Sequence, residues 1–521
     1  MSAPAANSAS DLLALHAQAQ PEKLAVIDDR ADGTLTRWSY LELNRRANRL
    51  ANQLSAAGVQ PRDRVVWCGQ NSPGVVAIIH AARKLGATAV PLNYRLTADE
   101  AAYIVDNCDA VLVWTDAEFA GLFAEIAPRC AKLRSVAVFG GPPRAGQLAG
   151  DAMLDSGDES EPKLAGVEAT SMIYTSGTTG NPKGAVRGAG DPAQSLALLR
   201  HLGYRPDDVY LPTGPLYHSG PGGFMGVAFS LGQTIVLQRK FDAEDWLRLV
   251  EKYRVTSTFS APTPIRLIVN LPEAVRAKYD RGSMRVMVAN AAPWSFALKQ
   301  AYLRDFPPSS LWEVYGSTEL GVDCVLKPED QLRKPGSCGQ AAPGVELVLF
   351  DDDGARVDEP NKPGELFVRS KNVLSTYHKA HDKFLADTRG DYHTVGDVAY
   401  FDEEGFFYIC DRKKDMIISG GMNVYPAEIE SALDHHADVM DCAVFGIPSE
   451  EWGELVHAVV VARPGSGLTA EDVTEFARKQ LAGYKVPRSI SFVPELPRTG
   501  SGKILKRVLR EPYWAGRKTR V

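Results

Sequence analysis

The chain has 521 residues, of which 45% are hydrophobic, 23% charged and 8% aromatic. This is the composition of an ordinary globular protein, so disorder, collagen and coiled coil are excluded, and the length predicts two to four domains. The net charge of −6 excludes a global basic excess of the kind that binds nucleic acid or an anionic membrane. The seven cysteines never form C-x-x-C, which argues against a disulfide scaffold or zinc site and for a reducing compartment.

The N-terminal 20 residues have no basic start and no apolar core of signal-peptide length. Apolar runs such as 74–82 and 458–462 are far shorter than the ~20 residues that cross a bilayer. We therefore expect a soluble, cytoplasmic protein without a transmembrane segment. Peripheral contact with a membrane stays open.

Strands and helices alternate along the first 290 residues or so. Predicted strands cover 64–68, 88–92, 110–114, 234–238, 256–260 and 284–289, and predicted helices begin near Ser39, Gly74 and Thr97. Ser39 and Thr97 are each followed three residues later by glutamate, the pattern of a capping box. Such alternation predicts parallel sheets covered by helices. The segment 140–167, rich in Gly, Pro, Asp and Glu, is predicted to be a surface connection.

From about residue 345 the pattern changes to short strands separated by turns, at 346–350, 364–369, 398–401 and 406–410. This predicts an antiparallel or barrel-like subdomain. A charged cluster at 411–415 precedes a compact αβ region that runs to the C-terminus. The sequence thus predicts an α/β protein with an N-terminal domain, residues 1–413, and a C-terminal domain, residues 414–521.

The strongest local motif is YTSGTTGNPKG, residues 174–184. Its glycines let backbone N–H groups turn toward one anion, its hydroxyls add donors, and its lysine adds a positive charge. No Gly-Lys-Ser/Thr occurs, so the motif is not a P-loop. The candidate phosphate-binding residues are Thr175, Ser176, Gly177, Thr178, Thr179, Gly180 and Lys183. On composition alone, a flexible surface loop is the alternative.

The exact string resembles the phosphate loop of the adenylate-forming superfamily, which includes acyl-CoA synthetases, peptide-synthetase adenylation domains and firefly luciferase. Four further motifs match in the family's order: YGSTE at 315–319, Gly396-Asp397, DRKKD at 411–415 and PRTGSGK at 497–503. The resemblance covers residues 20 to 510, approximately. It implies two αβ sheet subdomains and a small β-barrel-like subdomain in the large N-terminal domain, followed by a small, mobile C-terminal domain.

The resemblance assigns the nucleotide site. An aromatic face can stack on a base and a carboxylate can hold Mg²⁺. By similarity Tyr315 lies against adenine, Thr318 contacts the α-phosphate and Glu319 binds Mg²⁺. Asp397 binds the ribose with support from Arg412. The other nucleotide-site residues implied are Ala292 and Gly316. Val395 stands where the family usually has threonine, which removes one hydroxyl near the ribose.

Three further roles are implied for the C-terminal domain. Lys503 is similar to the family's mobile catalytic lysine, whose ammonium group neutralises charge at the α-phosphate. Gly420 and Gly421 resemble glycines that line the CoA tunnel, although a tight turn explains them equally well. Lys414 matches the hinge position, at which a residue absorbs a large φ/ψ change.

The acid pocket is the least defined site. The resemblance makes His218 a wall or gate of the pocket rather than a general base. The expected pocket residues are His218, Gly222, Ala291, Trp294, Gly316 and Leu320. The surrounding stretches are small or apolar and contain no Lys or Arg, which disfavours a second carboxylate on the substrate. Gly220, Gly222 and Gly223 are expected to leave room for a bulky or long apolar group.

These features imply an AMP-forming acid–CoA ligase that uses ATP, Mg²⁺ and CoA. The favoured acid is a medium- or long-chain fatty acid, with an aromatic or polycyclic acid as the alternative. Other hypotheses are an acyl-AMP ligase that loads a carrier protein, a luciferase-like oxygenase and a catalytically silent nucleotide-binding paralogue. No nucleic-acid partner is expected, and the sequence does not indicate an oligomeric state.

Overall fold

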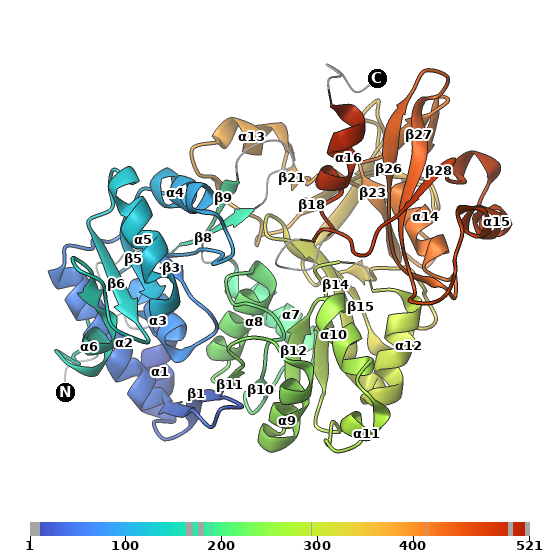
Figure 1. Ribbon diagram of the computed structural model, residues 1–521. Helices are drawn as coiled ribbons and strands as arrows, with labels where there is room; N and C mark the ends of the chain where they lie inside the picture. The colour runs from blue at the N-terminus through green and yellow to red at the C-terminus, as the bar shows by residue number, and fades with distance from the viewer. Residues whose placement is uncertain are drawn as a thin grey trace.

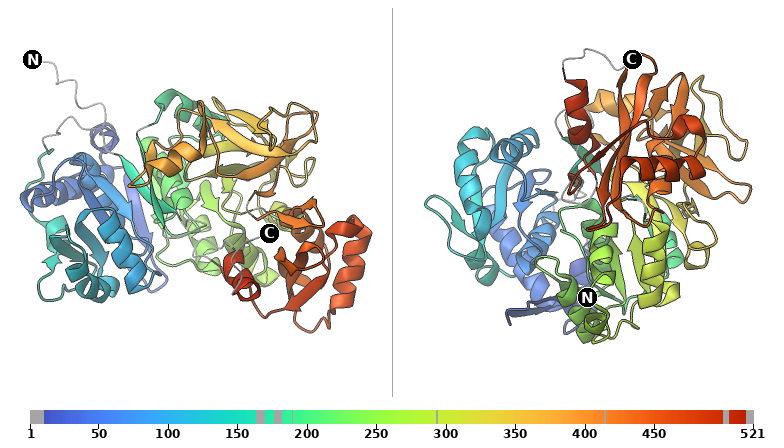
Figure 2. Two further views of the ribbon diagram at one scale, coloured as in Figure 1. Left: turned by 90° about the horizontal axis from the view of Figure 1, so that it is seen from above. Right: turned by 45° about the vertical axis from the view of Figure 1, so that its right-hand side comes forward.

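Five β-sheets organise the chain, as its computed structural model shows (Figure 1). The structure describes residues 11–162, 170–175, 182–188, 190–292, 294–413, 415–498 and 504–515. The N-terminal sheets and their helices lie side by side, and the C-terminal sheet forms a separate unit next to them in both views of Figure 2.

The first sheet is entirely parallel, in the order β4-β3-β5-β6-β7. Its strands are β3 (Arg64–Cys68), β4 (Thr88–Pro91), β5 (Ala110–Asp116), β6 (Ser135–Phe139) and β7 (Leu148–Ala149). The helices of this region are α3 (Pro73–Lys84), α4 (Ala98–Asn107), α5 (Ala120–Ile126) and α6 (Gly150–Asp155). The predicted parallel sheet is confirmed. The predicted surface connection at 140–167 is partly wrong, because it contains β7 and α6, whose Met153 and Leu154 are buried.

Helix α2 (Tyr40–Ala56) shows why the predicted helices form. The Ser39 hydroxyl accepts a hydrogen bond from the Glu42 backbone N–H at 3.2 Å, which satisfies one unpaired donor of the first turn. Leu43, Leu50 and Leu54 are fully buried at helical spacing. At α4, Thr97 and Glu100 form the complete, reciprocal capping box. Sequence signals therefore defined both helix starts.

The second sheet is nine-stranded and mixed, in the order β16-β15-β14-β13-β12-β10-β11-β1-β2. Its strands are β1 (Leu24–Asp29), β2 (Leu35–Ser39), β10 (Val209–Tyr210), β11 (Thr234–Leu237), β12 (Ser257–Ser260), β13 (Val286–Ala289), β14 (Leu311–Ser317), β15 (Gly321–Leu326) and β16 (Gln340–Ala341). The helices of this region are α1 (Leu12–Ala19), α7 (Pro192–His201), α8 (Ser219–Ser230), α9 (Ala243–Tyr253), α10 (Pro262–Val269), α11 (Glu273–Arg276) and α12 (Phe296–Asp305).

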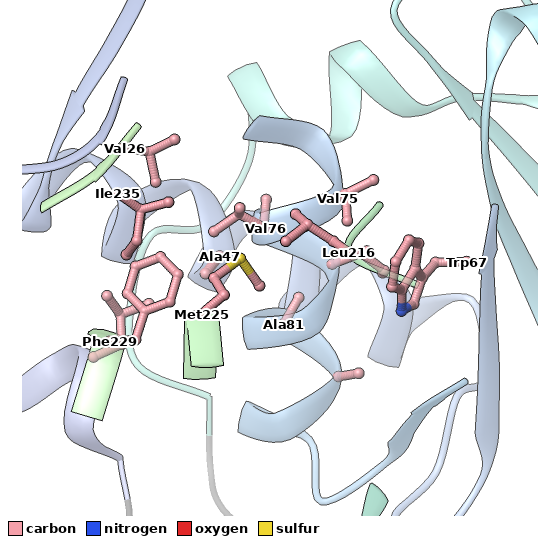
Figure 3. Close-up of a cluster of buried hydrophobic side chains, with 14 of the residues drawn as sticks. Val26, Ala47, Trp67, Val75, Val76, Ala81, Leu216, Met225, Phe229 and Ile235 are labelled. Carbon is pink, nitrogen blue, oxygen red and sulfur yellow. The ribbon is translucent and has the colours of Figure 1, made fainter. Parts of the chain in front are cut away.

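One buried cluster joins the first two sheets. Figure 3 shows Val76 of α3 beside Met225 of α8, and Phe229 of α8 next to Ile235 of β11. A continuous apolar core of this kind favours a fixed arrangement of the two subdomains, because separating them would expose the whole cluster to water. The ends of β9, β14 and α8 are thereby held in place around the site described below.

Two antiparallel sheets follow. The smaller one has the order β19-β9-β8, with β8 (Ser171–Thr175), β9 (Lys183–Arg187) and β19 (Thr376–Tyr377). The six-stranded one contains β17 (Glu346–Phe350), β18 (Gly364–Arg369), β20 (Thr388–Arg389), β21 (Tyr392–His393), β22 (Asp397–Phe401) and β23 (Phe407–Arg412), with helix α13 (His381–Ala386) beside it. The expected antiparallel subdomain is confirmed.

The C-terminal unit is a five-stranded sheet with three helices in the described residues. Its elements are β24 (Ile417–Ser419), β25 (Met422–Val424), α14 (Pro426–Leu433), β26 (Val439–Ser449), β27 (Gly453–Ala462), α15 (Ala470–Gln480), β28 (Ser489–Phe492) and α16 (Lys506–Trp514). Asp411 of β23 joins this unit to the rest, because its carboxylate accepts a hydrogen bond from the Ala427 N–H of α14 at 2.9 Å. The predicted boundary between 413 and 414 lies between β23 and β24 and stays a prediction.

Within the described residues, no helix is both long enough and apolar enough to cross a membrane.

Candidate active site

A single cavity of about 1990 Å³ gathers residues that are far apart in the sequence. Its walls come from β9, α7, α8, the turn between β14 and β15, and the start of β22. The predicted site residues that line it are Thr175, Lys183, His218, Ala291, Gly316, Thr318, Glu319 and Arg412. The five motifs therefore converge in space wherever the structure describes them.

The turn after β14 brings a hydroxyl and a carboxylate to this cavity. A side chain at Gly316 would place its Cβ 1.9 Å from the Gly321 carbonyl oxygen, so only glycine permits this close approach. Thr318 Oγ1 donates a hydrogen bond to Ser219 Oγ at the start of α8, 2.8 Å away. The Glu319 carbonyl accepts from the Leu374 N–H at 2.7 Å, which fixes the backbone beneath its carboxylate.

Arg412 lines the cavity and forms a polar group with Tyr315 and Asp397, neither of which is part of the lining. The Tyr315 hydroxyl donates to Asp397 Oδ2 at 2.5 Å, and Arg412 Nε lies 3.3 Å from Asp397 Oδ1. Asp397 and Arg412 are direct partners in the β22–β23 ladder. Burial, with Asp397 as a second cause, raises the pKa of Tyr315 well above its usual value, so its hydroxyl stays a donor. Sequence reasoning placed Asp397 and Arg412 together but missed the bond from Tyr315.

Glu319 is the residue that fits Mg²⁺. Nowhere in the described residues do three or more His, Cys, Asp or Glu side chains form a metal-binding cluster. Mg²⁺ characteristically takes one or two carboxylates together with substrate phosphates, and a single carboxylate on a cavity wall provides the protein part of such a site. Burial, with Glu319 as a further cause, raises the pKa of the adjacent Tyr377 hydroxyl.

Several predicted residues lie outside the described part of the chain: Ser176, Gly177, Thr178, Thr179, Gly180, Lys414 and Lys503. Thr175 and Lys183, which flank the first of these segments, pair with each other across β8 and β9. Arg498 and Ile504, which flank the last one, form an antiparallel bridge, and both Arg498 and Leu505 line the cavity. The roles expected for the undescribed residues stay predictions.

A group of apolar side chains also lines the cavity, and we call it the apolar wall. Its residues are Leu198 and Leu199 of α7, Phe224 and Val227 of α8, Phe259 of β12, Val314 of β14 and Val322 of β15. His218 caps the start of α8 and lines the cavity, with its ring centroid 4.3 Å from that of Tyr217. This position fits the expected wall or gate.

The structure differs from the expected acid pocket at several positions. Trp294 is buried in the core with Tyr302, and Leu320 packs into the cluster of Leu349 and Leu366, so neither side chain lines the cavity. Gly222, expected in the acid pocket, and Ala292, expected at the nucleotide, also lie outside the cavity lining. The Trp294 and Leu320 side chains do not reach the cavity because each is buried in an apolar core, Trp294 under the nine-stranded sheet and Leu320 in the six-stranded one.

The glycines of α8 leave less room than expected. A Cβ at Gly220 would lie 2.2 Å from Phe259, and one at Gly222 would lie 2.3 Å from the Leu216 carbonyl oxygen. Only Gly223 has open space beside it, with no atom within 4 Å. Two of the three glycines therefore permit close packing, and one contributes free volume.

Arg187 is a cavity residue that sequence reasoning missed. The expected pocket stretches contain no basic residue, yet Arg187 reaches the cavity from the end of β9. Strand alternation was the available signal, because positions 183 and 187 lie on the same face of a β-strand and Lys183 was already assigned to the site. The expectation against a second carboxylate on the substrate rested on those stretches alone, did not take Arg187 into account and stays a prediction.

Gly420 and Gly421 form the two-residue turn between β24 and β25, with φ of +59° and +76°. Two successive positive φ values favour glycine in such hairpins, so the turn alone explains both residues. The Gly420 N–H donates to the Trp452 carbonyl at 2.8 Å, and neither glycine lines the cavity. Their contact with CoA stays a prediction.

Comparison with known proteins gives a consistent result. The model of the AMP-binding enzyme family matches residues 13–378, and that of the AMP-binding enzyme C-terminal domain matches residues 428–503. The indoleacetate–CoA ligase of Aromatoleum aromaticum is 35% identical over 509 residues, which cover 96% of this chain and 97% of the relative. The long-chain-fatty-acid–CoA ligase FadD13 of Mycobacterium tuberculosis is 34% identical over 510 residues, 97% and 98% of the two chains.

Among solved structures, ATP-bound MatB from Rhodopseudomonas palustris aligns with a TM-score of 0.85 and 29% identity, covering 97% of this chain and 99% of that one. Its large N-terminal and small C-terminal domains match the arrangement seen here. The ordered motifs, their convergence on one cavity and these matches lead to one conclusion. The chain belongs to the AMP-binding enzyme family of the adenylate-forming superfamily and is an enzyme of the AMP-forming acid–thiol ligase class.

Proposed function

We propose that this protein activates a hydrophobic carboxylic acid with ATP and transfers the acyl group to CoA. The observation that carries the proposal is the composition of one cavity: Thr318, Glu319 and Arg412 at one end, and an apolar wall of aromatic and aliphatic side chains at the other. A nucleotide and an apolar acid fit side by side in such a space, with the acid carboxylate between them.

In the first step the substrate carboxylate attacks the α-phosphorus of ATP, the bond to the β-phosphate oxygen breaks, and pyrophosphate leaves. Thr318, held by Ser219, is placed to contact the α-phosphate, and Lys183 is placed near the other phosphates. Asp397, held by Tyr315 and Arg412, is suited to accept hydrogen bonds from two vicinal ribose hydroxyls. Lys503 supplies the positive charge that stabilises the transition state. Mg²⁺ held by Glu319 would neutralise phosphate charge.

In the second step the CoA thiolate attacks the carbonyl carbon of the acyl-adenylate, and AMP leaves. No protein nucleophile is needed, because the mixed anhydride is already a good acylating agent. The C-terminal domain turns about Lys414 between the steps, which withdraws Lys503 and presents Gly420 and Gly421 to the CoA arm. The cavity lining includes Arg498 and Leu505 but neither glycine, which is the arrangement that the first step requires.

For the acid, two classes compete. Phe224, Phe259, Leu198 and Val227 form a wall that suits either a flexible alkyl chain or a flat ring. The two relatives named above act, by their names, on a long-chain fatty acid and on indoleacetate. A medium- or long-chain fatty acid is the first candidate and an aromatic or polycyclic acid the second.

ATP-dependent exchange of labelled pyrophosphate, measured with alkyl and aryl acids in parallel, tests the first step. We expect exchange with at least one acid of either class and none without acid. If folded protein gives no exchange with any acid, the proposed first step is wrong. Supplying CoA or a phosphopantetheine-loaded carrier protein to the same reaction then identifies the acceptor, for which CoA is expected.

Lys503→Ala tests the two-step arrangement. It is expected to lose adenylation, by about 100- to 1000-fold for the removal of one transition-state contact, yet to form thioester from supplied acyl-adenylate. Lys479→Ala is the matched control, because Lys479 is exposed and paired with Glu475 on α15. If Lys503→Ala lost adenylation and thioester formation to the same extent, the two steps would not use different arrangements of the C-terminal domain, and the proposal would be wrong.

A further inference from the structure

Arg187 places a guanidinium group on the cavity wall, beside Gly321 at the start of β15. We propose that Arg187 is a specificity-determining residue that binds an oxygen acceptor on the substrate acid, remote from the reacting carboxylate. The preferred substrate then has an apolar body and one distal hydroxyl, oxo or carboxylate oxygen. This inference rests on the proposed function and narrows its substrate class.

The position of Arg187 along β9 separates it from the predicted phosphate loop. Lys183 begins the strand beside the predicted phosphate loop, and Arg187 ends it. At ~3.3 Å per residue, four residues span roughly 13 Å, and side chains at even spacing share one face. Arg187 therefore faces the same cavity as Lys183, roughly 13 Å farther from the loop, and Glu319 lies close enough for its charge to act on the guanidinium.

The surroundings of the guanidinium indicate that it has donors to spare. Its Nη2 donates to the Asn372 carbonyl oxygen. Among the described residues this is the one hydrogen bond recorded for Arg187, and no carboxylate lies within 4.0 Å of it. A guanidinium has five N–H donors, so most of them face the cavity or its wall without a protein acceptor. A Cβ at Gly321 would lie 3.1 Å from Nη2, so the missing side chain leaves room for the group.

Asp323 is a second polar group beside this site, behind the wall. In the β14–β15 ladder Tyr315 pairs with Cys324 and Gly316 with Val322, which leaves Asp323 as an extra, bulged residue. Its side chain is 0% exposed, and neither carboxyl oxygen has a hydrogen-bond partner among the described residues. Burial raises its pKa well above the usual value, and the nearby Arg187 opposes that shift. Asp323 is thus a buried polar group near Arg187, and we assign it a positioning role for the guanidinium.

The apolar neighbours explain why an acceptor is needed. Leu198, Val227 and Val322 line the same end of the cavity, and burial lowers the pKa of Arg187. A buried charge without full hydrogen bonding is costly, and an oxygen acceptor on the ligand offsets this cost. A purely apolar ligand would leave the guanidinium desolvated and unpaired, so it is expected to bind less well than its oxygenated analogue.

The test uses sets of acids with one skeleton, straight-chain or aryl, that carry hydrogen, hydroxyl, oxo or carboxylate at the distal end. Pyrophosphate exchange gives kcat/KM for each acid with the wild-type protein, Arg187→Met and Arg187→Lys. We expect the wild type to prefer one oxygenated acid over its unsubstituted analogue by at least tenfold. Arg187→Met should abolish or invert this preference while KM for ATP stays unchanged, and Arg187→Lys should retain part of it. Comparison of kcat/KM among the hydroxyl, oxo and carboxylate acids identifies which oxygen acceptor Arg187 binds.

Two further variants complete the design. Asp323→Asn should raise KM for the oxygenated acid severalfold without changing KM for ATP or the unsubstituted acid, which a merely structural role would not do. Arg356→Met is the control, because Arg356 is exposed and paired with Asp358 away from the cavity. An unchanged preference in folded Arg187→Met, or a rise in KM for ATP with an unchanged ranking of acids, would overturn the inference. If unsubstituted acids support exchange and no oxygenated acid is preferred, this inference fails while the proposed function stands.

Discussion

The two ends of the cavity are built in different ways. At the nucleotide end, each functional group belongs to a short string of residues, such as the turn of Gly316, Thr318 and Glu319. At the acid end, each wall residue comes from a different element: Leu198 from α7, Val227 from α8 and Val322 from β15. The nucleotide end is therefore defined by local backbone geometry, whereas the acid end is defined by how the helices and sheets pack.

This difference has a functional consequence. The nucleotide is the same for every reaction of the family, so changes at its end are expected to alter the rate with all acids equally. On the proposed function, single changes among the apolar wall residues are expected to leave the chemistry intact, because these side chains have no charged or hydrogen-bonding group for the phosphate. Variants at the two ends should therefore separate into effects on overall rate and effects on the ranking of acids.

Asp397→Ala is expected to have the largest effect. It removes the acceptor of the Tyr315 hydroxyl and the partner of Arg412, together with the predicted ribose contacts. Hydrogen bonds to a charged group contribute about 1.5–3 kcal/mol each, so kcat/KM for ATP should fall roughly 100-fold or more. The fall should be the same with an alkyl and an aryl acid.

Asp358→Ala is the matched control for this change, because Asp358 is an exposed carboxylate paired with Arg356 on the surface. Steady-state kinetics with two acids provide the measurement. A loss confined to one of the acids would show that Asp397 contributes to acid selection, which would remove the proposed division between the ends.

The fold could be predicted to a large extent because its signals are local. Strand β3 and the starts of α2 and α4 follow from apolar runs and caps, which act within one turn or one strand. The edge strand β7 was missed, because two exposed residues, Leu148 and Ala149, carry no strand pattern and pair only through tertiary context.

The candidate site divides in the same way. Thr318 and Arg412 could be placed from sequence, because their motifs fix both chemistry and local geometry. Arg187 and Trp294 could not, since the direction of each side chain depends on which core lies behind its strand or loop. The motifs bring Thr318 and Arg412 to the cavity as expected, whereas Trp294 and Leu320, expected in the acid pocket, are buried elsewhere, because a local motif does not specify packing partners.

The second prediction concerns the stability and acid preference of variants at two glycines of α8, Gly222 and Gly223. Gly222→Ala forces a Cβ to within 2.3 Å of the Leu216 carbonyl, whereas Gly223→Ala meets no atom within 4 Å. Overpacking costs about 1–3 kcal/mol, so Gly222→Ala should lower the free energy of unfolding by that amount. Gly223→Ala should leave stability unchanged or raise it by about 0.5–1 kcal/mol, because alanine favours helix.

Denaturant unfolding of the two variants measures the difference, and acid kinetics add a second readout. Gly223 lines the cavity, so Gly223→Ala should reduce kcat/KM for the bulkiest acid accepted and spare smaller ones. Equal stability of the two variants would contradict the close approach at Gly222. An unchanged ranking of acids in Gly223→Ala would show that the free space beside it is not used by the substrate.

His457 gives the smallest effect and tests a region outside both ends. In β27 its ring nitrogens lie 2.8 Å from Ser489 Oγ and 3.1 Å from Ser491 Oγ, and burial lowers its pKa from 6.5 to about 4. Between pH 6.5 and 4 the unfolded chain therefore binds a proton that the folded chain does not. The contribution of neutral His457 to the free energy of unfolding is fully present above pH 6.5 and is lost as the pH falls toward 4.

Thermal unfolding at a series of pH values should show this loss. The variant His457→Gln should weaken the pH dependence and leave the ranking of acids unchanged. A changed ranking would mean that the C-terminal unit takes part in acid selection, which the separation of the two ends does not allow.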